Sequence, residues 1–318
     1  MRSRLVAGLC VGLWAGVCQA DPTIASVTHG ELQAVSANGM GTYAATDKVV
    51  ITGIVLNNPE QIVDPTPGPE TGNMGGQWQI YIQGEGDDHA GTAVYMGQYY
   101  ANVGGSGNYG DADWIAELCR IDHDPNTGYV FSAGDRVRVT GWYKFYKGKL
   151  NINEKHQVES MFDFQVELIE PAAGLPQPEF ITLDTVKDAN DHFIFDSTRL
   201  TGCEYYQARL VRVDDVNVID PDNWAPNGTI TIMDNTGRTF PVKLGIGEGF
   251  TRFACPTGQI DVIGILDQES SGYTVCRDGY RLWVPDYDGN GLVLTDRGHR
   301  RENLLWDMDT QSQIDPMR

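Results

Sequence analysis

The chain contains the same arrangement of apolar segments twice, and this internal repeat limits the possible folds more than any other feature of the sequence. The segments with strand-like sequence are residues 48–58, 78–97 and 134–154 in the first copy and residues 205–219, 228–245 and 259–286 in the second. In chain order, each copy predicts a strand, a hairpin, a short connection and a second hairpin. The repeat therefore predicts two domains with the same topology.

Alternation of residue types supports these strands. Val137 and Val139 alternate with arginines, so that one face of the strand is apolar and the other is charged. The following turn contains Gly148, which tolerates positive φ. The 37 glycines, 14 tyrosines and 7 tryptophans of the chain also favour short strands joined by turns over long helices. We therefore expect an all-β fold.

Between the third and fourth strands, each copy contains a short segment compatible with a helix, at residues 111–121 and 247–256. A helix in this position can cover the bottom of a small barrel. Five strands with such a helix follow the order of the OB-fold, a Greek-key barrel whose face and loops often hold oligonucleotides or oligosaccharides. We predict an all-β protein of two tandem OB-fold-like five-stranded Greek-key barrels, each with a short helix between strands three and four.

Four motifs carry a resemblance to known proteins: VVITGIV and GDRVRVTGWYKFYKGKLNI in the first copy, and ARLVRVDDVNV and IDVIGI in the second. They resemble the tandem OB-like modules of secreted bacterial proteins, some of which accompany extracellular nucleases. The resemblance covers most of residues 46–295. It implies the two-barrel fold and a place among secreted or envelope proteins. The motifs specify a strand and its entry turn, so they imply no particular ligand.

The first twenty residues have the anatomy of a secretory signal peptide, with Arg2 and Arg4, an apolar run, and Ala20 before Asp21. The run is shorter than the roughly 20 residues that a membrane-spanning helix needs. We therefore predict a secreted or periplasmic protein without a membrane span. The predicted divisions of the chain are a signal peptide at 1–20, a first OB-like domain at 21–165, a Pro-rich linker at 166–186, a second OB-like domain at 187–296 and a polar, partly disordered tail at 297–318.

The charge of the chain limits its partners. The sequence has 23 Lys and Arg against 43 Asp and Glu, and loss of Arg2 and Arg4 with the signal peptide would change the net charge from −20 to −22. Such a surface repels phosphate backbones at long range. The charge therefore argues against general binding of duplex DNA, and it suits a soluble protein outside the cell or one that binds cations.

Four cysteines follow the predicted signal peptide, at Cys119, Cys203, Cys255 and Cys276. Cysteines in an oxidising compartment can form disulfides, and the spacing here does not fit a zinc cluster. Cys203, Cys255 and Cys276 all fall in the predicted second barrel. We therefore predict one disulfide among these three.

The sequence contains none of the common motifs of enzyme chemistry. It has no His-Glu-x-x-His, no Gly-x-Ser-x-Gly and no phosphate-binding glycine loop followed by Lys-Ser or Lys-Thr. His89 and His123 each lie beside carboxylates, which can bind a metal or tune a general base but are also common in polar turns. We therefore predict a protein that is not an enzyme.

One segment of the second copy is a weak candidate for calcium binding. In DYDGNG, Asp286, Asp288 and Asn290 occupy the first, third and fifth places of an EF-hand-like loop. The twelfth place is Arg297, where the pattern needs an acidic residue. The alternative is a simple turn that closes the last strand pair. No other cofactor is predicted.

The closing hairpin of the first copy concentrates positive charge in an acidic chain. The candidate ligand-binding residues in this hairpin are Arg136, Arg138, Trp142, Lys144, Lys147 and Lys149. Trp142 and Lys144 share the strand face of the arginines, whereas Tyr143 and Phe145 share the apolar face. An exposed tryptophan beside cations can stack a base or a sugar ring. The alternative is a solvated hairpin whose lysines pair with nearby acids and protect an edge strand from aggregation.

These features predict a secreted, acidic, non-catalytic binding or surface-associated protein built from two OB-like modules. Its ligand is left open between an oligosaccharide and single-stranded nucleic acid. The alternative function is an accessory single-stranded nucleic-acid-binding component of an extracellular nuclease system, for which binding should weaken strongly with salt.

Overall fold

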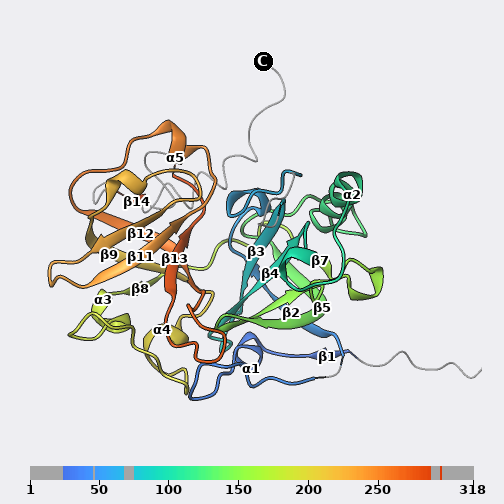
Figure 1. The fold of residues 1–318 in the computed structure, drawn as a ribbon, viewed down its shortest axis with the longest axis horizontal. Helices are drawn as coiled ribbons and strands as arrows, with labels where there is room; N and C mark the ends of the chain where they lie inside the picture. Colours follow the sequence, from blue (N-terminus) through green and yellow to red (C-terminus); the bar gives the residue numbers. More distant parts are fainter. Residues whose placement is uncertain (1–23, 46, 68–74, 288–293, 296–318) are drawn as a thin grey trace, which may run out of the picture.

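The computed structural model describes residues 24–45, 47–67, 75–287 and 294–295. It contains two closed five-stranded barrels that lie side by side, the first on the right of Figure 1 and the second on the left. The predicted fold class is therefore confirmed. The predicted signal peptide and polar tail lie outside the described residues.

The first barrel has the strand order of an OB-fold. Its strands are β2 (Val49–Val55), β3 (Gln77–Gln83), β4 (Gly91–Gly97), β5 (Arg136–Tyr146) and β6 (Lys149–Asn153). The order in the sheet is β2-β3-β4-β6-β5, and pairing of β5 with β2 closes the barrel. Strands β4 and β6 run parallel, whereas the other neighbours within the barrel are antiparallel.

The second barrel repeats this topology. Its strands are β9 (Leu210–Val218), β10 (Thr229–Met233), β11 (Thr239–Leu244), β12 (Ile260–Gln268) and β13 (Tyr280–Val284). The order is β9-β10-β11-β13-β12, and β12 pairs with β9 to close the barrel. Strands β11 and β13 are the parallel pair, as β4 and β6 are in the first barrel. The internal repeat in the sequence is thus a repeat of the fold.

A helix follows the third strand of each barrel, as predicted. In the first barrel, α2 (Asp111–Ile121) buries Trp114 and Ile121, and the Trp114 indole N–H donates to the Pro65 carbonyl at 2.7 Å. In the second barrel, α5 (Gly249–Arg252) is a single turn that buries Phe250. These apolar side chains fix each helix against the end of its barrel because their burial removes them from water.

Short elements flank the barrels. They are β1 (Ala25–Ser26), α1 (His29–Leu32), η1 (Pro59–Gln61), η2 (Ala101–Val103), η3 (Ser160–Phe162), β7 (Gln165–Glu170), β8 (Glu179–Ile181), α3 (Leu183–Val186), α4 (Gly202–Tyr205), η4 (Pro221–Asn223) and β14 (Leu294–Thr295). The segment 166–186 was predicted to be a linker, but it contains β8, α3 and most of β7. Strand β7 pairs with β5 and β8 pairs with β9, because Val166 of β7 packs in the first core and Ile181 of β8 in the second.

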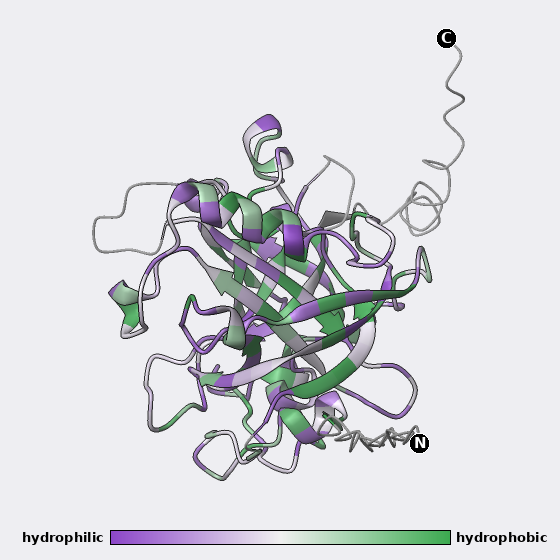
Figure 2. Cartoon of the chain, turned by 90° about the vertical axis from the view of Figure 1, so that its right-hand side faces the viewer, coloured by the Kyte–Doolittle hydropathy of each residue, from purple (hydrophilic) through white to green (hydrophobic). Residues whose placement is uncertain are grey.

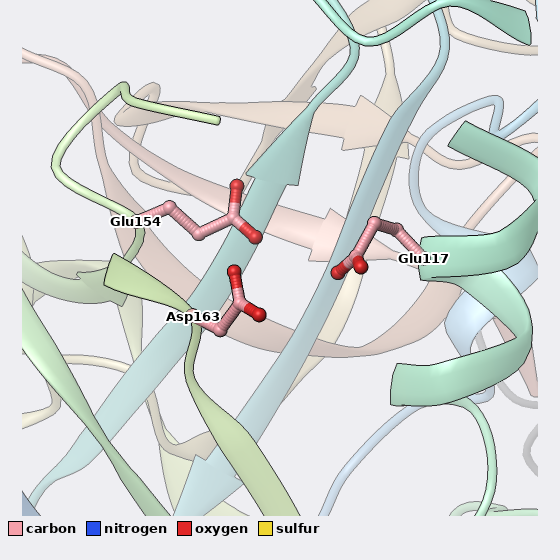
Figure 3. A group of neighbouring side chains, drawn as sticks. All are labelled: Glu117, Glu154 and Asp163. Atoms are coloured by element: carbon pink, nitrogen blue, oxygen red, sulfur yellow. The ribbon is translucent and has the colours of Figure 1, made fainter. Parts of the chain in front are cut away.

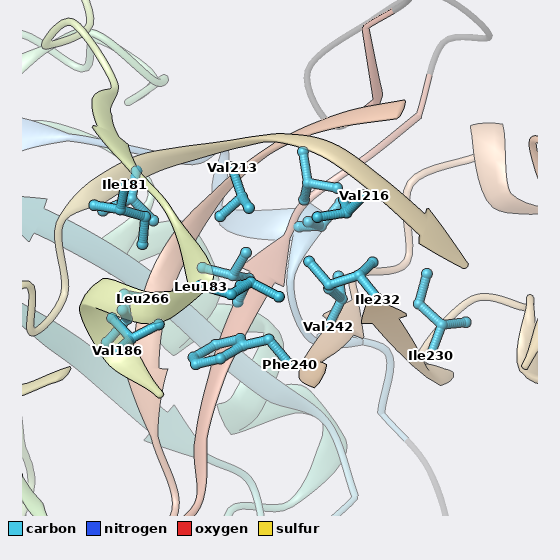
Figure 4. Packing of buried hydrophobic residues seen from close by; sticks show 14 of the residues in the cluster. Ile181, Leu183, Val186, Val213, Val216, Ile230, Ile232, Phe240, Val242 and Leu266 are labelled. Atoms are coloured by element: carbon cyan, nitrogen blue, oxygen red, sulfur yellow. The ribbon is translucent and has the colours of Figure 1, made fainter. Parts of the chain in front are cut away.

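Each barrel encloses its own core. In the second barrel, Phe240 and Val242 of β11 pack against Ile232 of β10 and Leu266 of β12, as Figure 4 shows in part. In the first barrel, Trp78, Tyr100 and other large side chains fill the corresponding space. Figure 2, which looks toward the first barrel, shows hydrophobic and hydrophilic residues interspersed along its strands. This is the pattern expected when one face of each strand points into the core.

A third apolar cluster joins the two barrels. Its buried residues are Leu56, Ile62, Tyr81 and Ala93 from the first half of the chain and Ala208, Leu210, Ile265 and Trp283 from the second. Two hydrogen bonds cross the same contact: the Gly91 N–H donates to the Gln207 carbonyl at 3.0 Å, and the Leu210 N–H donates to Gln83 Oε1 at 2.9 Å. The barrels therefore pack through apolar surface and backbone contacts rather than being tethered by a linker alone.

A buried polar network completes this contact. Lys149 is 5% exposed and Asp267 is 0% exposed, and the two form an ion pair across the barrels. Asp267 also accepts from the Trp283 indole at 2.9 Å and lies 3.0 Å from the Arg281 guanidinium. Burial alone would raise the pKa of Asp267, but Lys149 and Arg281 hold it below its ordinary value. The carboxylate therefore stays charged because three groups satisfy it.

The predicted disulfide is wrong, because all four cysteines among the described residues are free. Cys203 lies in the second core, where its thiol contacts the Val186 carbonyl at 3.3 Å. The Cys276 thiol contacts the Gly272 carbonyl at 3.5 Å, and the Cys255 thiol contacts the Pro256 carbonyl at 3.7 Å. Shared position in one barrel does not bring side chains together, because residues on different strands and loops point in different directions.

In the part of the chain that the structure describes, no helix has the length and apolar content needed to cross a membrane.

Candidate functional site

The second and third strands of the first barrel, where OB-folds often hold ligands, are covered. The side chains of β3 that alternate with the core set are Gln79, Tyr81 and Gln83, and these residues are 7%, 0% and 3% exposed. Tyr81 belongs to the apolar cluster between the barrels, and Gln83 bonds to Leu210 of the second barrel. This face of the first barrel is therefore closed to a ligand.

The equivalent face of the second barrel is more open but carries acids. The Thr231 hydroxyl on β10 donates to Asp220 at 3.0 Å, and the Thr239 hydroxyl on β11 donates to Asp191 at 2.6 Å. Both carboxylates lie beside these strands. The same face also carries Lys243, whose Nζ lies 5.9 Å from the centre of the Trp283 ring, so acids and a cation are mixed on this surface.

Two lysines of the predicted basic hairpin serve the contact between the barrels. Lys147 Nζ lies 3.4 Å from Glu269, and the Lys147 carbonyl accepts from the Ser270 N–H at 2.8 Å. Lys149 is buried with Asp267. The prediction that Lys149 is a ligand-binding residue is therefore wrong, because the tip of the hairpin docks on the second barrel.

The two arginines of the hairpin pair with acids, whereas the alternative interpretation of the hairpin expected such pairs for its lysines. Arg136 contacts Glu85 at 2.8 Å and also Glu170. Arg138 lies 3.5 Å from Glu167, its partner in the β5–β7 register. Exposed pairs of this kind contribute about 0–1 kcal/mol to stability. They nevertheless neutralise the positive charge of both arginines.

Trp142 and Lys144 have a different environment. The Trp142 indole N–H donates to the Met161 carbonyl at 3.1 Å, and Lys155 Nζ lies 3.9 Å from the centre of the Trp142 ring. Lys144 Nζ lies 3.2 Å from Nδ1 of His156. The aromatic–lysine patch consists of Trp142, Lys144, Lys155, His156 and Phe162, whose ring centre is 6.1 Å from that of Trp142.

The charge of this patch is not neutralised by acids. Among the described residues, no carboxylate lies within ion-pair distance of Lys144 or Lys155. Burial lowers the pKa of Lys144, and Lys155 lowers it further. Burial and Lys144 lower the pKa of His156 to about 4. At neutral pH the imidazole is therefore uncharged, and Nδ1 can accept a hydrogen bond from Lys144.

Sequence reasoning identified Trp142 and Lys144 but missed Lys155, His156 and Phe162. These three lie after β6, in a segment with no strand periodicity. Lys155 and His156 both have positive φ, at 52° and 59°, which is uncommon for residues other than glycine. No local signal in the sequence predicts this turn. Only the tertiary structure shows that Lys155 and His156 contact residues of β5.

The histidines noted in the sequence have other contacts. His89 Nε2 lies 2.8 Å from Glu179, and the ring stacks on Tyr205 at 4.0 Å, which joins the two halves of the chain. His123 Nδ1 lies 2.7 Å from the Cys119 carbonyl at the end of α2. Both arrangements fit a structural role.

The weak calcium candidate is only partly described. Asp286 Oδ1 accepts from the Gly249 N–H at 3.0 Å and from the Tyr287 N–H at 2.7 Å, so this carboxylate holds the start of α5. Asp288 and Asn290 lie outside the described residues.

Three carboxylates converge at the first barrel. Glu117 comes from α2, Glu154 follows β6, and Asp163 precedes β7; Figure 3 shows their carboxylate groups facing one another. One ligand oxygen from each lies within 4.8 Å of the others. Carboxylate oxygens are the ligands that hard cations such as calcium prefer. Sequence reasoning missed this acidic cluster, because its members are separated in the chain.

Glu204 in α4 is a buried carboxyl group of the second barrel. Burial raises its pKa to about 7, although the Tyr280 hydroxyl, which donates at 2.5 Å, and Arg199 both favour the charged form. Unlike Glu154, Glu204 belongs to no group of three converging acids among the described residues. Its charge is therefore governed by burial and by neighbours of its own barrel.

We expect Glu204 to make stability depend on pH. Because folding raises its pKa from 4.5 to about 7, its stabilising contribution is complete below pH 4.5 and is lost as the pH rises through 7. The loss corresponds to about 3 kcal/mol. Relative to the unmodified protein, Glu204→Gln should gain about this free energy of unfolding between pH 4.5 and pH 7.5. Urea unfolding followed by circular dichroism measures the difference, and a difference that does not change with pH would contradict the prediction.

Comparison with known proteins adds little to this geometry. No protein-family model matches the chain, and no curated protein matches it. Among solved structures, the chain is similar to one described as "Structure and Conformational Change of a Replication Protein A Heterotrimer Bound to ssDNA", with a TM-score of 0.30 and 9% sequence identity. The match covers 84% of this chain and 54% of that chain, so the protein spans about half of that chain's length. The strand order of the two barrels itself defines the class, a tandem OB-fold-like protein.

Proposed function

We propose that the protein is a secreted, non-catalytic binding protein whose aromatic–lysine patch binds a short stretch of single-stranded nucleic acid. The observation that carries this proposal is Lys155 over the Trp142 ring, with Lys144 nearby on His156 and, among the described residues, no carboxylate within ion-pair distance of either lysine. Aromatic rings stack nucleobases, and lysines contact the phosphates between them. The secreted location rests on the signal-like N-terminal sequence.

The remainder of the molecule limits how such a ligand can bind. The OB face of the first barrel is closed by the second barrel, and the net charge of −20 repels nucleic acid at long range. The site therefore suits a few nucleotides held locally, with modest affinity. An acidic oligosaccharide would offer similar rings and charges, and the binding experiment below distinguishes the two ligand classes.

We expect Trp142→Ala to weaken binding of a short oligothymidylate by roughly 5- to 150-fold, because stacking on an aromatic side chain contributes about 1–3 kcal/mol per base. Fluorescence anisotropy of the labelled oligonucleotide measures the affinity. Two phosphate contacts give a salt slope of about −1.4, so binding should fall about sevenfold between 50 and 200 mM salt. Lys144→Ala combined with Lys155→Ala should remove most of this salt dependence.

Arg138→Ala is the matched control, since Arg138 is a cation of the same strand but is paired with Glu167. It should leave the affinity nearly unchanged. If oligonucleotide binding is absent, or if it survives Trp142→Ala, the proposal is wrong. Binding of an acidic oligosaccharide in place of the oligonucleotide, with the same dependence on Trp142, would assign the patch to carbohydrate instead.

A further inference from the structure

The acidic cluster of Glu117, Glu154 and Asp163 has the dimensions of a site for one ion. An oxygen from each residue lies within 4.8 Å of the other two. Calcium takes oxygen ligands at about 2.3–2.6 Å, so oxygens on opposite sides of one calcium ion are up to about 5 Å apart. The three side chains come from separate elements and point to the same space (Figure 3).

The burial of Glu154 is a second and independent observation. The residue is 0% exposed, and among the described residues no hydrogen bond of good geometry reaches its carboxylate oxygens. The Tyr109 hydroxyl, which is 7% exposed, is a potential donor to this carboxylate, but it also lacks a hydrogen bond of good geometry. Burial raises the pKa of Tyr109, and the charge of Glu154 raises it further. Buried polar groups normally have partners, because leaving them unsatisfied costs free energy.

The cations already present compensate the Glu154 carboxylate only in part. Arg120 contacts Glu117 at 2.6 Å and donates to the Phe164 carbonyl at 2.7 Å, but it remains 4.0 Å from Glu154. Lys48 donates to the backbone carbonyl of Asp163 at 2.6 Å. Three carboxylates therefore face one another, and the nearby Arg120 guanidinium binds mainly Glu117. A divalent cation would balance the charge of Glu154 and Asp163.

We propose that Glu117, Glu154 and Asp163 bind a single calcium ion. Calcium tolerates irregular arrangements of six to eight oxygens, some of them water, whereas magnesium demands near-ideal octahedral geometry. The three carboxylates come from a helix and two loop positions, and they impose no octahedral arrangement. The ion would join α2 to the segment between β6 and β7, and so would fix the outer wall of the first barrel.

The test uses the full chain after removal of metal by a chelator. Titration with calcium chloride, followed by thermal unfolding, should raise the melting temperature in a saturable way, by roughly 5 °C at 100 times the dissociation constant. Isothermal calorimetry should show one site per chain. Glu154→Gln should weaken binding at least tenfold, since it removes a charged ligand but retains the shape of the side chain.

Glu204→Gln is the matched control, because Glu204 is also buried with a raised pKa but lies outside the cluster. This variant should keep the whole calcium-dependent rise in melting temperature. Two results would overturn the proposal. One is a calcium effect that persists in Glu154→Gln, which would place the ion elsewhere. The other is no calcium effect in the unmodified protein, which would leave Arg120 as the cation that balances the cluster.

Discussion

Replacing Asp267 with alanine is expected to lower the free energy of unfolding by about 3–5 kcal/mol. The change removes the buried partner of Lys149, which is 5% exposed. It also removes the carboxylate that accepts from the Trp283 indole N–H and pairs with the Arg281 guanidinium. Removing one member of a buried ion pair is strongly destabilising because the other charge is left uncompensated. Chemical denaturation in urea measures the loss.

The double variant Lys149→Ala with Asp267→Ala provides the internal control. Residues in one buried network do not act independently, so the double variant should lose less free energy than the sum of the two single variants. Small-angle scattering should show whether Asp267→Ala also separates the barrels. A loss below about 1 kcal/mol for Asp267→Ala would contradict the importance of this network.

Replacing Phe240 with alanine is expected to cost about 3–5 kcal/mol, which is the range for removing a large aromatic side chain from a packed core. Phe240 lies on β11, is 1% exposed, and packs at 5.7 Å, edge to face, against Phe193 (Figure 4 shows its place in the core). The cavity left behind would be lined by rigid strands of a closed barrel, which limits relaxation. Thermal and urea unfolding both report the change.

Phe180 offers a matched phenylalanine in the same half of the chain. It lies on β8 but is 59% exposed, so Phe180→Ala should change stability by no more than about 0.5 kcal/mol. Equal losses for Phe180→Ala and Phe240→Ala would show that the packing of the second core is not the source of stability. The comparison holds residue type constant and changes only burial.

The candidate sites show where sequence reasoning stops. Trp142 and Lys144 were found because they lie on one strand, where alternation alone assigns a face. Lys149 was a candidate because the hairpin concentrates positive charge, yet it is buried against Asp267, 118 residues away in the sequence. Pairing across two domains leaves no periodic signal in either segment.

The wrongly predicted disulfide and the missed acidic cluster have the same cause. Cys203 and Cys276 share a barrel, but each is buried in its own surroundings and both are free. Glu117 and Asp163 lie 46 residues apart and nevertheless face one another with Glu154. The distance between two side chains in a barrel depends on strand order and loop path, which spacing in the sequence does not reveal.

The sequence by itself determined the architecture of this protein. Alternation within each strand, glycine at the turns and a short helix segment in each repeat are local signals, and together they specify two barrels of one topology. Only the tertiary structure decided which surfaces remain available. The second barrel covers the β3 face of the first through Tyr81 and Trp283, and it takes Lys147 and Lys149 out of the basic hairpin. These outcomes depend on contacts between distant residues, whose free energies are set by burial and pairing rather than by local pattern.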